Sequence, residues 1–184
     1  MADKKAILVN ANGRKLAGSG EALDKLNKKA AVLPNADASG LADKAVALGG
    51  VKCAPADIAS TLEKSVLAVV DGAEDALAAA LDAANRRTVL VVAADDGVAF
   101  YGLGINGKAG KVARKVDAGD VALTIATIAD MPIGEDCEAG VIYQVLKDPN
   151  LKLNELIKLQ EALARMESVI ERNNREPWDK HDCA

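Results

Sequence analysis

The sequence contains few aromatic residues and no excess of positive charge, and both shortages narrow the possible partners. Phenylalanine, tryptophan and tyrosine make up only 2% of the 184 residues, so aliphatic side chains must fill the core. Small aliphatic side chains bury little apolar surface per residue, and this favours further burial through self-association. The net charge of −4 and the missing aromatic stacking platforms argue against nucleic acid as a partner.

Histidine and cysteine are equally scarce. The single histidine, His181, lies close to the C-terminal end, so a Ser/His/Asp or Cys/His catalytic arrangement is not expected. The three cysteines, Cys53, Cys137 and Cys183, are widely spaced, which indicates a reducing compartment without a disulfide framework. We expect Cys53 and Cys137 to be small buried residues.

Long hydrophobic runs are also missing. No signal peptide and no run of about 18 apolar residues appear, so we expect no membrane as a partner and a cytoplasmic location. Length and patterning predict an α/β core domain over residues 1–149, an oligomerisation helix over 150–176 and a flexible tail over 177–184.

Short apolar segments, each followed closely by Asn or Asp and then Gly, predict buried strands at Lys5–Val9, Ser65–Val70 and Thr88–Ala94. The segments between them have helical periodicity. Strands that alternate with helices are typical of α/β proteins, so we predict a mostly parallel sheet flanked by helices. The predicted helices cover residues 21–30, 39–48, 55–62, 71–85, 120–129 and 135–147.

The chain changes character after Gly97. Apolar residues predict two strands, over 98–107 and 111–116, joined in a small hairpin at Asn106-Gly107. The string Gly102-Leu-Gly-Ile-Asn-Gly107 matches a dinucleotide-binding pattern, but a hairpin is predicted where that pattern requires a helix. The stretch is basic, and the alternatives are an anion-binding surface and a solvated strand edge. The candidate anion-binding residues are Lys108, Lys111 and Arg114.

A heptad pattern marks the last part of the chain. A long helix is predicted over 150–173, and its apolar residues recur at alternating spacings of three and four, as in a coiled coil. Ala162 and Val169 widen this seam, so we expect self-association of more than two copies. The alternative is that the helix covers its own domain. The predicted oligomer interface is Leu156, Leu159, Leu163, Met166 and Ile170.

The strand at Thr88–Ala94 ends in the residues with the most chemical promise. Ligands of open α/β sheets bind beyond the carboxyl ends of the strands, which makes Asp95-Asp96-Gly97 the best candidate for chemistry. The alternative is a structural role, because Asn, Asp and Gly are the usual residues of turns and helix caps.

Two segments carry a family resemblance. Residues 75–97, a predicted helix and buried strand followed by Asp-Asp-Gly, resemble the part of the alkaline phosphatase superfamily core that ends in Asp-His-Gly. Residues 116–134 resemble the closing segment of that core. The resemblance covers roughly residues 71–147. It implies an alkaline-phosphatase-like core and the hydrolysis or transfer of phosphate or sulfate esters, with a Ser or Thr nucleophile between two divalent metals.

The chain departs from this family at most of the metal-binding positions. Asp95 matches a metal ligand, but Asp96 stands where the family has His, and Asn12 stands where it has a ligand Asp. The later His ligands are missing, because no histidine precedes His181. The remaining cofactor hypothesis is an all-oxygen Mg²⁺ or Mn²⁺ site at Asp95, Asp96 and Asp71, and a chain without metal is equally expected.

Together these features predict a non-catalytic relative of the alkaline phosphatase fold that self-assembles through its C-terminal helix. The first alternative is a metal-dependent phosphoesterase or phosphomutase with a remodelled carboxylate site. The second is a module that binds a small ligand or nucleotide through the hairpin predicted over residues 102–115.

Overall fold

The computed structural model describes residues 3–11, 13–134 and 137–175 of the chain. Residues up to Lys147 form a compact α/β unit, and residues from Asp148 onward form a second unit, which contains helix α6 (Leu151–Arg175). Within the described ranges, no helix is both long and apolar enough to cross a membrane.

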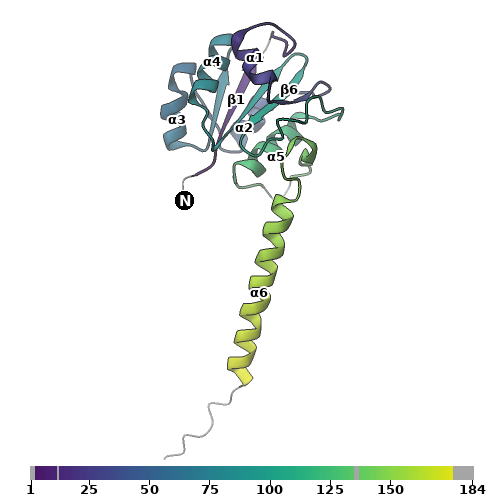
Figure 1. Ribbon diagram of the computed structural model, residues 1–184. Coiled ribbons are helices and arrows are strands. Elements are labelled where there is room, and N and C mark those ends of the chain that lie inside the picture. The colour runs from purple at the N-terminus through teal and green to yellow at the C-terminus, as the bar shows by residue number, and fades with distance from the viewer. Residues whose placement is uncertain (1–2, 12, 135–136, 176–184) are drawn as a thin grey trace, which may run out of the picture. The chain divides into compact units, whose positions relative to one another are not determined.

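The α/β unit is built on one six-stranded sheet (Figure 1). Its strands are β1 (Lys5–Ala11), β2 (Ala31–Leu33), β3 (Val51–Lys52), β4 (Leu67–Asp71), β5 (Thr88–Ala94) and β6 (Gly97–Gly102). They lie in the order β2-β6-β5-β1-β4-β3. Strands β3, β4, β1 and β5 pair in parallel, while β6 is antiparallel to both of its neighbours. The predicted α/β fold with a mostly parallel sheet is therefore confirmed.

Helices cover both faces of the sheet (Figure 1). They are α1 (Glu21–Asn27), α2 (Leu41–Ala47), α3 (Ile58–Lys64), α4 (Glu74–Ala83) and α5 (Ala118–Ile128), with short 3₁₀ turns η1 (Pro55–Asp57) and η2 (Tyr143–Val145). Helices α1, α3 and α4 pack in one layer, and α2 and α5 pack in the other. Burial on both faces explains why the strands are apolar without alternation.

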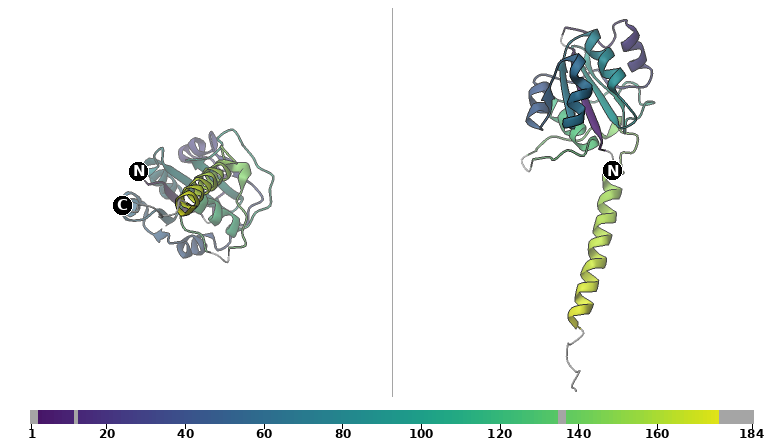
Figure 2. Two further views of the ribbon diagram at one scale, coloured as in Figure 1. Left: turned by 90° about the horizontal axis from the view of Figure 1, so that it is seen from below. Right: turned by 90° about the vertical axis from the view of Figure 1, so that its left-hand side faces the viewer.

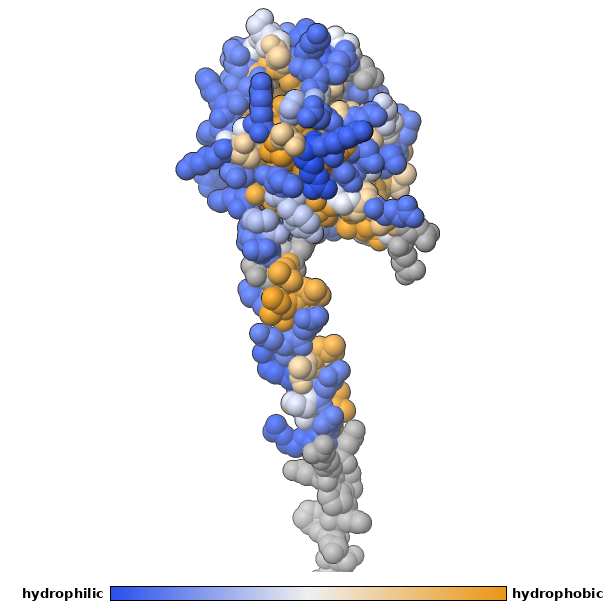
Figure 3. All heavy atoms as spheres, turned by 90° about the vertical axis from the view of Figure 1, so that its right-hand side faces the viewer, coloured by the Kyte–Doolittle hydropathy of each residue, from blue (hydrophilic) through white to orange (hydrophobic). Residues whose placement is uncertain are grey.

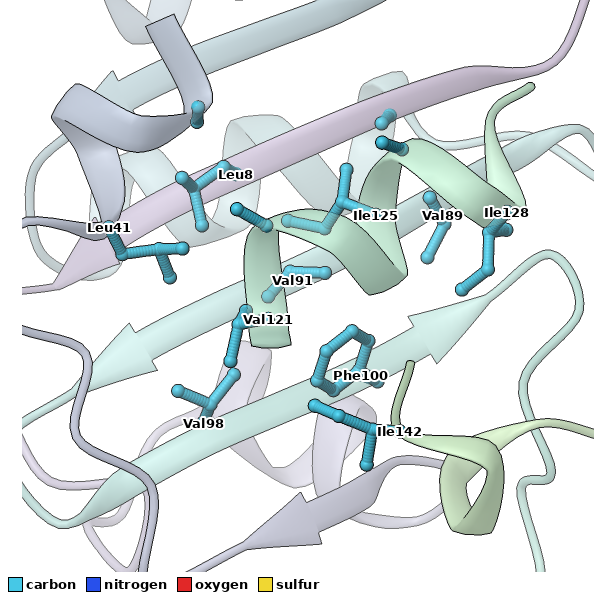
Figure 4. Packing of buried hydrophobic residues seen from close by; sticks show 14 of the residues in the cluster. Leu8, Leu41, Val89, Val91, Val98, Phe100, Val121, Ile125, Ile128 and Ile142 are labelled. Atoms are coloured by element: carbon cyan, nitrogen blue, oxygen red, sulfur yellow. The ribbon is translucent and has the colours of Figure 1, made fainter. Parts of the chain in front are cut away.

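The layer that contains α5 holds the only phenylalanine of the chain (Figure 4). Phe100 of β6 is fully buried in a cluster with Val91 of β5 and Ile125 of α5. Thr124 of α5 is also fully buried, and its hydroxyl donates to the carbonyl of Asp120 at 2.7 Å and accepts from the backbone N–H of Ile142 at 3.0 Å. The second hydrogen bond ties the segment that follows α5 to the helix.

The small hairpin lies at a different turn from the predicted one. Strands β5 and β6 form it around Asp95-Asp96, with Ala94 paired to Gly97, and not around Asn106-Gly107. The physical reason is burial, because the first four residues of β6 have apolar or no side chains and lie inside the sheet between β5 and β2. Residues 111–116 form no strand, and they run along the outer edge of β2 through isolated bridges.

Other local predictions also need correction. Within 137–147, the described part of the helix predicted over 135–147, only the 3₁₀ turn η2 is helical. Helix α5 begins at Ala118, two residues before the predicted start, and is capped by Asp117, whose carboxylate accepts from the N–H of Asp120 at 3.0 Å. Cys53 is half-buried and Cys137 is exposed, so the prediction that both are buried was wrong. Residue 137 lies in an open loop, where no neighbouring layer covers it.

Candidate functional site

A polar cleft of about 970 Å³ opens at the carboxyl ends of the parallel strands. Asn10 of β1, Asp71 of β4 and Asp95 after β5 line it from the sheet, and residues 36–43 line it from the start of α2. This is the position at which open α/β sheets bind ligands. The expectation that ligands bind beyond the carboxyl ends of the strands points to this cleft. The sequence analysis did not name Asn10, although it lies near the carboxyl end of β1 and lines the cleft.

The three predicted metal ligands do not share this cleft. Asp71 and Asp95 line it, whereas Asp96 lines a separate cavity of about 270 Å³ together with Lys111. Among the residues that the structure describes, no group of three or more His, Cys, Asp and Glu side chains is placed to hold a metal ion. Asn12, the other position compared with a family ligand, lies outside the described residues.

The carboxylates of Asp95 and Asp96, in the turn between β5 and β6, accept hydrogen bonds from backbone N–H groups. Asp95 accepts from the backbone N–H of Gly13 at 3.0 Å. Asp96 accepts from the N–H of Leu16 at 2.6 Å and from the N–H of Ala17 at 3.1 Å. These bonds fasten the loop after β1 to the β5–β6 turn. The turn therefore has a structural role that accounts for two adjacent carboxylates.

Three further aspartates of the cleft have partners. Asp71 accepts from the side-chain amide of Asn10 at 2.8 Å, and Asp43 lies 3.4 Å from the ammonium of Lys52. Asp37 accepts hydrogen bonds from Ser39, including one from its N–H at 2.9 Å, and these bonds hold the pKa of Asp37 below its ordinary value, with a smaller contribution from the charge of Lys115. The lining is thus a set of paired polar groups at the surface.

The predicted anion-binding residues separate into two kinds. The guanidinium of Arg114 donates to the carbonyl of Val141 at 3.2 Å and to the side chain of Gln144 at 3.0 Å, so it holds the segment before α6. Lys108 and Lys111 are exposed on the loop beside β2. Among the described residues, no contact that the structure shows joins Arg114, Lys108 and Lys111 into a single anion-binding site.

The glycines of the dinucleotide-like string have backbone roles. Gly102 has a φ of +93°, and a Cβ there would lie 2.5 Å from the carbonyl oxygen of Thr88. Gly104 has a φ of +71°. Residues 103–117, all of them described, contain no helix, so no helix N-terminus is present to receive a phosphate after this string.

Figure 2 shows α6 as an unbroken helix. It presents an apolar surface instead of a cleft (Figure 3). It covers 25 residues, Leu151–Arg175, close to the helix predicted over 150–173. The side chains of the predicted interface are between 50% and 68% exposed, namely Leu156, Leu159, Leu163, Met166 and Ile170. Val169 beside them is 49% exposed. In the space-filling view, hydrophobic side chains recur along the helix among hydrophilic ones (Figure 3).

The described part of the α/β unit exposes fewer large hydrophobic side chains than α6 does. Its exposed large hydrophobic side chains are Val46, Val51, Ile133 and Tyr143, and single exposed residues of this kind are normal on protein surfaces. A continuous stripe of exposed apolar side chains, like that on α6, is not normal on such surfaces.

Comparison with known proteins identifies no relative of this chain. No protein-family model, no curated protein and no solved structure matches it.

Proposed function

We propose that the chain is a non-catalytic, alkaline-phosphatase-like α/β unit that self-assembles through α6 into a homo-oligomer of more than two copies. The observation that carries this proposal is the exposed heptad seam of α6, which includes Leu156, Leu163 and Ile170. Every copy carries the same stripe, so a second copy is a complementary partner for it. The function is to bring several α/β units together.

The energetics favour covering this seam. Burying a Leu, Ile or Met side chain contributes about 1.5–3 kcal/mol, and each α6 offers several of them. In water, the helical propensity of its residues gives an isolated helix little stability. Most of the stability of helices in proteins comes from packing an apolar face against a neighbour. At a rise of about 1.5 Å per residue, the helix is roughly 37 Å long, which gives the seam several core layers.

The shape of the apolar face supports more than two helices. A two-stranded coiled coil needs apolar residues at two positions in seven, whereas Ala162 and Val169 extend the face of α6 to a third position. The first core position holds Leu156, Leu163 and Ile170, so β-branched residues do not dominate it as they do in dimeric coils.

The absence of catalysis is supported by the state of the carboxylates. Asp95 and Asp96 accept hydrogen bonds from the loop after β1, and Asp96 lies outside the cleft that contains Asp71. The sequence also lacks the histidines that the resembled family uses to hold its metals. A two-metal site of that family has no counterpart among these residues.

Native mass spectrometry of the untagged chain at micromolar concentration tests the assembly. We expect a single homo-oligomeric mass of more than two copies. Leu163→Asp puts a charge into the seam and should give monomers, because burying an unpaired carboxylate costs several kcal/mol. Ser168→Asp is the matched control, because residue 168 lies on the opposite side of the helix from the seam and should leave the mass unchanged. A wild-type monomer contradicts the proposal.

The second candidate is a metal-dependent phosphoesterase or phosphomutase that uses the strand-end cleft. Asp71 and Asp95 favour it, because both line the cleft at the carboxyl ends of β4 and β5. A screen of generic phosphate and sulfate esters with Mg²⁺, Mn²⁺ and Zn²⁺ tests it. Asp95→Asn keeps an acceptor for Gly13 but removes the charge, so turnover that this variant abolishes would replace our first proposal.

A further inference from the structure

The two flanks of the α6 seam differ in character. On one side lie Ala162 and Val169, which we call the apolar flank, and on the other lie Gln160 and Glu167, which we call the polar flank. Ala162 is half-buried, and the other three side chains are exposed. A helix whose two flanks were alike would not distinguish between the possible directions of its neighbour.

Helix direction decides which flanks meet. In a parallel bundle the helices are related by rotation about the bundle axis, so the apolar flank of one helix faces the polar flank of the next. Ala162 would then lie against Glu167 of the second copy, and the contact would pull a carboxylate toward the core or leave the alanine uncovered. In an antiparallel pair, a twofold axis perpendicular to the helices brings each flank against the same flank of its neighbour.

From this asymmetry we infer that neighbouring α6 helices associate in antiparallel pairs, joined across the apolar flank. The inference rests on the proposed self-assembly. Ala162 then packs beside Val169 of the second copy, a small side chain against a branched one, which suits interdigitation. Gln160 and Glu167 meet each other on the polar flank, where both retain access to water.

The pairing of Ala162 with Val169 sets the register of this pair. With the twofold axis between Leu163 and Met166, Leu163 of one copy packs against Met166 of the other, and Leu159 packs against Ile170. Both of these core layers are apolar, so neither buries a polar group without a partner. Leu156 then lies opposite Asn173, farther from the twofold axis. The α/β units, which precede α6 in the chain, then join the bundle from both of its ends.

Cysteine pairing in the full-length chain tests the direction. Cys53, Cys137 and Cys183 are first replaced by serine, and native mass spectrometry confirms that this background still assembles. Chains with Leu159→Cys and chains with Ile170→Cys, distinguished by a mass tag, are then co-expressed and mildly oxidised. We expect the mixed disulfide between the two chains, because the antiparallel register places residue 159 beside residue 170.

The two directions give different products. In the antiparallel register, two copies of residue 159 are separated by about 16 Å along the bundle, since they are offset by 11 residues, and a disulfide needs Cα atoms within about 7 Å. In a parallel bundle, each residue meets its own copy, so only the disulfides between identical chains would form. The mixed disulfide supports the inference.

The remaining outcomes overturn it in distinguishable ways. Disulfides between identical chains only, in an assembled protein, would overturn the antiparallel direction and leave the self-assembly intact. An assembled protein without either disulfide would overturn the proposed register. A monomeric mass for the wild-type chain would overturn both the inference and the proposed function on which it rests.

Discussion

Helices α5 and α6 contain similar apolar residues but differ in what covers them. Eight of the eleven residues of α5 are buried, since the sheet, α2 and the segment after the helix enclose it. The large apolar side chains of the α6 seam are at least half exposed. The comparison shows that the α/β unit covers most of its large apolar side chains with its own residues, whereas those of the α6 seam stay exposed. In our proposal, other copies of the chain cover this seam. The predictions below test this division.

The largest effect is expected from Gly97→Ala in the α/β unit. A Cβ at this position would overlap the carbonyl oxygen of Leu33, and the φ of +140° strains any other residue. We expect a loss of at least about 3 kcal/mol in the unfolding free energy, because steric overlap adds to backbone strain. Urea denaturation measures this loss.

Gly134→Ala is the matched control for this prediction, because nothing lies within 4 Å of a Cβ there and its φ is not positive. It should leave stability almost unchanged. If Gly97→Ala were as mild as the control, the tight contact between β6 and β2 would not be a constraint on the hairpin.

The same substitution in both units sharpens the comparison. Leu8→Ala empties a fully buried site of β1 and should cost about 2–5 kcal/mol at any protein concentration. Leu159→Ala should leave the α/β unit unchanged and weaken only the assembly, with an effect that grows on dilution. Hydrogen-exchange mass spectrometry resolves the two regions. A loss of protection in the α/β unit of Leu159→Ala would argue that α6 stabilises its own domain.

A smaller effect is expected from Thr124→Val in α5. The substitution removes the acceptor of the buried Ile142 N–H while keeping the shape of the side chain, so it should cost about 1–3 kcal/mol. Thr127→Val is the control, because the hydroxyl of Thr127 donates only within its own helix, to the carbonyl of Leu123. Thermal unfolding of both variants would show whether the tie to Ile142 matters.

The smallest effect concerns pH. The pKa of Asp37 is lowered by its hydrogen bonds from Ser39, so its ionised form is favoured in the folded state. The stabilisation is therefore present above the ordinary aspartate pKa of about 3.9 and is lost as the pH falls through the lower folded value. The difference in Tm between wild type and Asp37→Ala should shrink over this range. A difference that persists unchanged below it would mean that the charge has no role.

Local sequence patterns were sufficient for the main strands and for α6. Strands β1, β4 and β5 follow from runs such as Leu90-Val91-Val92, because only burial on both faces of a sheet favours such runs at this length. The α6 seam follows from spacing alone, because the period of a helix is a local property. The position of the cleft at the strand ends was predictable for the same reason.

Long-range contacts decided the rest. Asp95-Asp96 and Asn106-Gly107 are both suitable turns, and the choice between them depended on β6 fitting between β5 and β2. Strands β2 and β3 are too short to carry a pattern of their own and exist through their neighbours. Arg114, a candidate anion-binding residue, donates to the carbonyl of Val141, which lies 27 residues away in the chain.

The sequence by itself determined the apolar strands, the heptad seam of α6 and the scarcity of histidine. Each of these depends on residue identity and local period. Only the tertiary structure decided that Asp96 lies outside the cleft and accepts hydrogen bonds from the backbone N–H groups of Leu16 and Ala17. It also decided that Asp71 and Asp95 line the same cleft. The physical reason is that hydrogen-bond partners far apart in sequence are chosen by how the chain folds, which no local pattern encodes.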